Sequence, residues 1–264
     1  MILFSSSISG YSFISGGIIF CGYILKSLSI QYIFYYNSDG KFLIDNPSSS
    51  YLSSSSNAFR HNQLWGWPLL SFKPFRGPFH GLITAWNLIM ASVFAIFVTE
   101  CYCRSLTCMH FDPLNKYGLH RVLMDFLLAV VHQSILEYYW HRLMHYKFFY
   151  SVFHKIHHYY KSPEPWDDMY IHPLEAFGYY CILYSPPFIY HVHSYSFVAY
   201  MIVMGICGVL DHSGVRISLF GIYSTVDHSY HHEKFNVNYS FPFPYMDMLH
   251  GTYFRQPNAF ASKH

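Results

Sequence analysis

Long runs of apolar residues, separated by polar stretches, recur along the 264-residue chain. A helix that crosses the hydrocarbon core of a bilayer needs about 20 mostly apolar residues. Three runs come close to this length and two shorter ones follow them, at residues 7–25, 81–101, 119–139, 174–190 and 195–210. The pattern therefore predicts an all-α, multi-span helical membrane protein.

The two shorter runs flank the sequence SPPFIYHVHS, whose proline pair is typical of a turn. We expect a hairpin that enters the membrane and returns, either as two full spans or as a re-entrant or tilted pair. Such a hairpin puts the histidine-rich segments before and after it on one side of the membrane. Only Arg104, Lys116 and Arg121 would then lie on the opposite face. The positive-inside rule therefore predicts that these histidines face the cytosol.

The chain before the second run differs in composition from the rest. It contains the sequence DNPSSSYLSSSSN, which cannot build a core and is typical of a mobile linker. We therefore divide the chain into residues 1–80, one span plus a Ser-rich linker, and residues 81–264, a domain that carries the remaining apolar runs.

Composition supports the membrane interpretation. Hydrophobic residues make up 52% of the chain and charged residues 11%, against about 25% charged residues in soluble proteins. The net charge of +2 and the lack of a basic stripe argue against a nucleic-acid partner. The six cysteines form no C-x-x-C pair, so we interpret them as small buried hydrophobic residues and not as a disulfide framework.

Three histidine clusters carry the candidate chemistry. They have the forms H-x-x-x-H, H-x-x-H-H and H-x-x-H-H, and we call them the first, second and third boxes. Residues three or four apart share a face of a helix, so the imidazoles of each box can aim at one point. Eight imidazoles exceed what one four-coordinate zinc needs, and they suit two metal ions that share a cage. The boxes comprise His141 and His145; His154, His157 and His158; and His228, His231 and His232.

For most of the remaining histidines we favour structural roles. His132 lies inside the third apolar run, where it is either a buried polar contact or a functional residue. A loose surface tract that binds zinc is disfavoured, because the boxes lie among tryptophan, tyrosine and phenylalanine. We expect structural roles for His61, His80, His110, His120, His191, His193, His250 and His264.

Three acidic residues lie near the boxes in the sequence. Asp211 and Asp227 directly precede histidines, and Glu137 lies four residues before His141. Carboxylates in such places often orient metal-binding imidazoles through the second ring nitrogen. Carboxylates in such places can also cap a helix or stay in contact with solvent, and the sequence leaves these alternatives open.

With this spacing in view, the chain resembles the fatty acid hydroxylase/sterol desaturase superfamily of membrane di-iron oxygenases. The segments YWHRLMH, HKIHH and HSYHHEKFNVNY resemble the family's three boxes, and HPLE, DHSG and MDMLHGTY resemble further family segments. Through DHSG and HPLE, the resemblance adds His212 as a ligand candidate and His172 as a weaker one. Two departures affect the ligand count and the closing motif: Gly208 stands where some relatives have a histidine, and Met246 where tryptophan is common.

The resemblance implies that residues 81–264 form a catalytic domain with a cytosolic di-metal cap. It also implies two iron ions, O2, electrons from NAD(P)H through a separate cytochrome b5-type carrier or reductase, a lipid substrate and an endoplasmic-reticulum location. We expect hydroxylation of a sterol or other long-chain lipid, with sterol desaturation as the nearest alternative. Two alternatives of other classes are a histidine-rich metal transporter, with its site at the bilayer midplane, and a non-catalytic relative that binds lipid.

Overall fold

Four long helices dominate the computed structural model, which describes residues 7–37 and 75–255. Each of the four is long and apolar enough to cross a membrane. They are α1 (Gly10–Ile30), α3 (Pro78–Cys103), α5 (Leu119–Met144) and α9 (Ser194–Asp211). The predicted all-α, multi-span architecture is therefore confirmed, whereas most of the predicted Ser-rich linker lies outside the described residues.

Shorter elements connect the long helices. The π-helical turn η1 (Gln31–Asn37) extends α1. The remaining helices are α4 (Leu114–Tyr117), α6 (Lys147–Val152), η2 (His154–Tyr159), η3 (Asp167–Met169), α7 (Pro173–Leu183), α8 (Pro186–Ile189), α10 (Thr225–Lys234) and α11 (Tyr245–His250). Strands β1 (Met109–His110) and β2 (Val192–His193) pair in parallel, and β3 (Ser218–Leu219) and β4 (Tyr223–Ser224) pair antiparallel.

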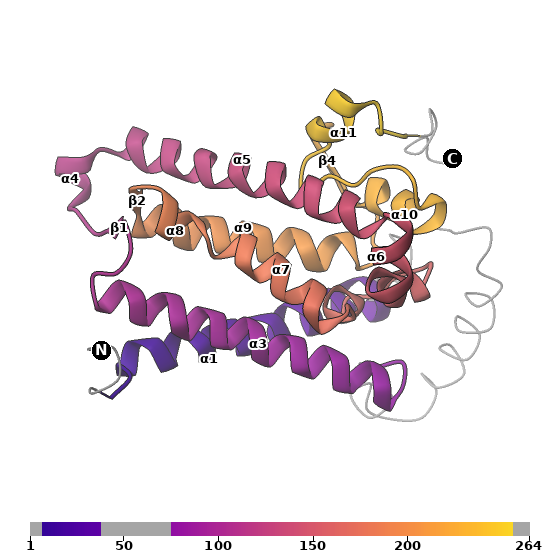
Figure 1. Ribbon diagram of the computed structural model, residues 1–264, viewed down its shortest axis with the longest axis horizontal. Coiled ribbons are helices and arrows are strands. Elements are labelled where there is room, and N and C mark those ends of the chain that lie inside the picture. Colours follow the sequence, from indigo (N-terminus) through magenta and orange to yellow (C-terminus); the bar gives the residue numbers. More distant parts are fainter. Residues whose placement is uncertain (1–6, 38–74, 256–264) are drawn as a thin grey trace.

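The long helices lie side by side along the longest axis of the molecule (Figure 1). Helix α1 packs on α3, and α5 packs on both α7 and α9. Their shared core includes Ala91, Ala129, Tyr200 and Met204. Many large apolar side chains point outward from the same helices, as expected for a surface that faces lipid.

The two ends of the bundle differ. Elements α4, β1 and β2 gather at one end, and α6 and α10 gather at the other (Figure 1). All three histidine boxes lie at the α6 and α10 end, because α5 ends there with the first box and α10 contains the third. The bundle therefore brings sequence segments almost 100 residues apart to one place.

Several helix boundaries differ from the sequence prediction. Helix α5 continues beyond the expected end at residue 139, so His141 lies in its last turn. Helix α7 stops at Leu183, because Pro186 and Pro187 lack the N–H groups that a continuing helix needs. The first arm of the predicted hairpin is therefore a short helix followed by α8, and only the second arm, α9, has the length of a span.

Candidate metal centre

Nine histidines converge into two adjoining groups. The first histidine group is His141, His145, His154, His158 and His231. The second histidine group is His157, His212, His228 and His232. The groups adjoin each other, since the rings of His158 and His232 lie 4.7 Å apart.

The second and third boxes divide in the same way. Histidines four apart, such as His154 and His158 or His228 and His232, stay in one group. His157 and His231 each point to the other group. The spacing of the histidines predicted that each box points to one place. In the structure, the second and third boxes each contribute to both groups.

Ring nitrogens on the outside of the first group are fixed by acceptors. Nδ1 of His141 lies 2.8 Å from the carbonyl oxygen of Tyr239, and Nδ1 of His231 lies 2.7 Å from that of Val237. A carbonyl oxygen only accepts, so each Nδ1 carries the proton and donates it. Each Nε2 therefore keeps a free lone pair, which is the form that binds metal.

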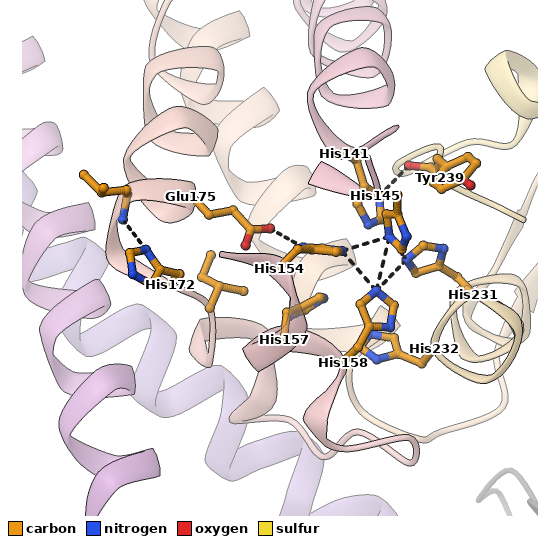
Figure 2. A network of polar contacts seen from close by, with 12 residues as sticks. His141, His145, His154, His157, His158, His172, Glu175, His231, His232 and Tyr239 are labelled. Atoms are coloured by element: carbon orange, nitrogen blue, oxygen red, sulfur yellow. Dashed lines mark hydrogen bonds and ion pairs between the residues drawn. The ribbon is translucent and has the colours of Figure 1, made fainter. Parts of the chain in front are cut away.

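A carboxylate fixes a third ring in the same way. Nδ1 of His154 donates to Oε1 of Glu175 at 2.6 Å, and both side chains are fully buried. Figure 2 shows this contact on the side of His154 that faces away from the other imidazoles. Glu175 belongs to the HPLE segment, and sequence reasoning did not assign it a role.

The inward-facing nitrogens are packed closely. In the first group, Nε2 of His145 lies 2.9 Å from Nε2 of His154, 3.2 Å from that of His158 and 3.1 Å from that of His231 (Figure 2). In the second group, Nε2 of His228 lies 2.9 Å from that of His212 and 3.1 Å from that of His232. Nε2 of His141 is buried without a hydrogen-bond partner among the described residues.

These distances fit a metal ion in each group. Two nitrogens that each lie about 2.1 Å from one ion are about 3 Å apart when they bind at right angles. Converging lone pairs repel one another in the absence of a cation, and a cation between them turns that repulsion into attraction. Imidazole ligands suit iron, zinc, copper and nickel. The donor set therefore fits two transition-metal ions.

The electrostatics keep the imidazoles neutral. Burial lowers the pKa of His145, His157, His158, His228 and His232, and neighbouring imidazoles lower it further. Burial lowers the pKa of His231 to about 3. Protons therefore do not compete with a metal for these nitrogens near neutral pH.

His172, the weaker ligand candidate, lies apart from both groups within the described part of the chain. Its Nδ1 accepts a hydrogen bond from the backbone N–H of Leu174 at 3.2 Å, so its ring caps the first turn of α7. Figure 2 shows it beyond Glu175, on the far side from the converging nitrogens.

The three acidic residues singled out in the sequence have other partners. Glu137 accepts a hydrogen bond from Gln133, and Asp211 accepts one from the hydroxyl of Tyr223 at 2.7 Å. Asp227 forms an ion pair with Arg255. The carboxylates that contact ligand candidates are instead Glu175 and Asp168, the latter with Oδ1 3.4 Å from Nδ1 of His212.

Several histidines outside the boxes have ordinary structural contacts. Both ring nitrogens of His132 are bonded, to Tyr190 at 2.8 Å and Ser185 at 2.7 Å. His80 pairs with Asp167, and His110 pairs with Asp112. These contacts agree with the structural roles expected for such residues and with the buried polar contact considered for His132.

Among the described residues, a bundle of apolar helices with nine histidines gathered at one end defines a class: an integral membrane protein with a histidine-rich cluster that could hold metal. Comparison with known proteins identifies the family within that class. Residues 126–252 match the family model described as fatty acid hydroxylase. This region, just under half of the chain, belongs to the fatty acid hydroxylase/sterol desaturase superfamily, as the sequence predicted.

Curated relatives are similar over the same region. A Delta(7)-sterol 5(6)-desaturase of Gibberella zeae is 29% identical over 52% of this chain and 39% of its own length. Human lathosterol oxidase is 27% identical over 64% of this chain and 57% of its own. Human fatty acid hydroxylase domain-containing protein 2 is 31% identical over 56% of this chain and 45% of its own. The chain thus spans about half the length of these relatives, and no solved structure matches it.

Proposed function

We propose that this protein is an O2-dependent di-iron oxidoreductase that oxidises a C–H bond of a sterol or other long-chain lipid, with hydroxylation as the outcome. Electrons come from NAD(P)H through a separate cytochrome b5-type carrier or reductase. The protein resides in the endoplasmic-reticulum membrane, with its histidine groups facing the cytosol. The observation that carries the proposal is the convergence of nine imidazoles into two groups at one end of a membrane bundle.

The chemistry explains why two metal ions are needed. When bound, a redox-active metal pair supplies the O2 chemistry that breaks an unactivated C–H bond, which no side chain can do. His141, His145, His154, His158 and His231 would hold one ion, and His157, His212, His228 and His232 the other. His172 is left out of this ligand set, because its ring caps α7.

The chain's own residues orient and shield the centre. Tyr239, Val237 and Glu175 each hold an Nδ1–H, which aims the opposite nitrogen inward. Most of the imidazoles are buried, so the centre excludes bulk water. A dry site of this kind protects an oxidant from side reactions.

Sterol desaturation is the second candidate, and the names of the relatives favour it. Two of the relatives described above are named a sterol desaturase and a lathosterol oxidase. Both outcomes begin with loss of a hydrogen atom from carbon. Oxygen then adds to give an alcohol, or a second hydrogen leaves to give an alkene.

Position argues against the transporter alternative. Transport sites lie near the bilayer midplane, often on broken helices. Here His141 lies in the last turn of α5, and His212 directly follows α9. Histidines at the ends of spans suit a reaction with a lipid at the membrane surface.

The test combines metal analysis with lipid profiling. We expect about two iron ions per chain in detergent-purified protein, as two groups require, and fewer in a His157→Ala/His158→Ala variant. Cells that express the parent should accumulate a lipid that has gained one oxygen atom, or has lost two hydrogens if desaturation is the outcome. A parent without iron and without a lipid product would refute the proposal and revive the non-catalytic alternative.

A further inference from the structure

A carboxylate from outside the boxes lies beside the second histidine group. Asp168, on η3, places Oδ1 3.4 Å from Nδ1 of His212. The same Nδ1 lies 2.9 Å from the carbonyl oxygen of Gly208. The carbonyl oxygen of Gly208 only accepts, so Nδ1 of His212 carries the proton and donates it, and Nε2 keeps its lone pair for a metal. Asp168 adds a negatively charged neighbour to the same Nδ1–H.

Gly208 makes room for this carboxylate, and Gly205 on the same face of α9 makes room for a lysine. A Cβ atom at Gly208 would lie 3.1 Å from Oδ1 of Asp168, which is closer than an ordinary contact. A Cβ atom at Gly205, three residues earlier, would lie 3.0 Å from Nζ of Lys26. Lys26 in turn donates a hydrogen bond to the carbonyl oxygen of Gly205. The α9 surface thus admits both an acidic and a basic side chain next to His212.

Helix α1 and its extension η1 hold the segment that carries Asp168. The hydroxyl of Tyr23 donates to the carbonyl oxygen of Pro165 at 3.2 Å, and Nε1 of Trp166 donates to Oε1 of Gln31 at 2.9 Å. Helix α1 lies outside residues 126–252, the region that matches the family. The N-terminal helix is therefore connected to the centre through a part of the chain that the boxes do not include.

The charge balance gives Asp168 a reason to be there. Four neutral imidazoles do not offset the charge of a divalent ion, and burying an uncompensated charge is costly. Asp168 places a carboxylate 3.4 Å from the ring of one of these imidazoles, His212, where its charge partly offsets that of an ion.

We propose that Asp168, on a segment held by the N-terminal helix, is a positioning residue of the second histidine group and raises the affinity of that group for a divalent metal. This inference rests on the proposed function, since it requires a metal in the group. Its mechanism is local: the carboxylate supports the direction of the His212 ring, whose tautomer the Gly208 carbonyl fixes, and it partly offsets the charge of the ion.

The test is a cobalt(II) titration of the metal-depleted full chain in detergent, followed by ligand-field absorption. The parent should bind two ions. Asp168→Ala should weaken one of them by about 10- to 100-fold, as loss of such a partner commonly does. Asp168→Asn keeps an oxygen acceptor without the charge, so it should restore part of the affinity. Gly208→Ala should weaken the same ion by displacing the carboxylate.

Two comparisons assign the effect to the second group. In a His157→Ala background, where that group is broken, Asp168→Ala should not weaken the remaining ion further. Asp112→Ala is the matched control, because Oδ2 of Asp112 lies 3.0 Å from Nδ1 of His110 at the opposite end of the bundle (Figure 1). This control should leave both ions bound as in the parent.

Unchanged binding of two ions by Asp168→Ala would overturn the inference, and so would equal weakening of both ions. Either result would leave the proposed function intact. A parent that binds no cobalt would instead count against the proposed function itself. The two failures are therefore distinguishable.

Discussion

The two histidine groups are built from the same sequence boxes but are secured differently. In the first group, three rings have an acceptor at Nδ1: His141, His154 and His231. In the second group, His212 has such contacts, to Gly208 and Asp168. Within the described ranges, Nδ1 is buried without a hydrogen-bond partner in one ring of the first group, His158, and in two rings of the second, His157 and His232. The first group is therefore the better preorganised one, and we expect it to bind metal more tightly.

The comparison also shows what the neighbouring elements contribute. Glu175 and Asp168 both lie inside the family-matched region, and Glu175 of α7 contacts the first group directly. The segment that carries Asp168 is held by α1, which lies outside that region. The second group thus depends more on the N-terminal helix. Changes in α1 should accordingly affect the second group and leave the first unchanged.

The largest expected effect comes from a pair of adjacent residues that point to different groups. His158→Ala removes a ligand of the first group, and His157→Ala one of the second. Each should lower lipid product formation by more than about 100-fold. Loss of a residue that only orients a ligand costs up to about 100-fold, and loss of the ligand itself should cost more. Product analysis by mass spectrometry and iron content per chain measure the two effects. Substantial product from either variant would mean that one group suffices.

A smaller effect is expected from the carboxylate of the first group. Glu175→Ala leaves the buried Nδ1–H of His154 without its acceptor, which costs about 1–3 kcal/mol. Metal affinity of the first group should fall by about 10- to 100-fold, and the second group should keep its affinity.

Cobalt titration of Glu175→Ala beside Asp168→Ala checks this selectivity, and Glu175→Gln, which retains an acceptor oxygen, should recover part of the loss. If Glu175→Ala weakened only the second group, the assignment of His154 to the first group would be wrong.

Much of this architecture was predictable from the sequence, because both the spans and the boxes are local patterns. Apolar runs predicted the four long helices, and the spacing of the boxes singled out eight of the nine converging histidines. The family was also identified from these motifs, with His212 added through DHSG. The role of all nine as metal ligands remains a prediction.

The remainder depends on tertiary placement. His157 and His158 are neighbours in the sequence, and only the packing of η2 against α10 decides which group each joins. Glu175 and Asp168 lie far from their partner boxes in sequence, whereas the nearby acids Glu137, Asp211 and Asp227 pair elsewhere. Proximity along the chain was therefore a poor guide to the carboxylate partners.

Acidification should destabilise the metal-free protein through these buried imidazoles. Their pKa values are lowered in the folded state, to about 3 for His231, whereas an unfolded histidine titrates near 6.5. The unfolded chain therefore binds more protons below pH 6.5, and stability is lost as the pH falls from about 6.5 towards the lowered values. Each such histidine contributes up to about 1.4 kcal/mol per pH unit.

Thermal unfolding of the metal-free protein between pH 7.5 and 5.5 measures this dependence. We expect a falling midpoint, with a shallower fall in His231→Asn, which removes one of the groups that titrate only after unfolding. A midpoint independent of pH would show that the imidazoles are already solvated, contrary to their burial.

The smallest effect is expected from substitution of His172, which distinguishes the role of a helix cap from that of a metal ligand. Its Nδ1 accepts from the N–H of Leu174, so His172→Ala should lower the free energy of unfolding by about 0.5–1 kcal/mol, the usual cost of losing a cap. Iron content should match the parent. His154→Ala is the contrasting variant, because that ring lies on the other side of Glu175 among the converging nitrogens (Figure 2). Loss of an iron ion in His172→Ala would return this residue to the ligand set, and it would require α7 to move its N-terminus toward the first group.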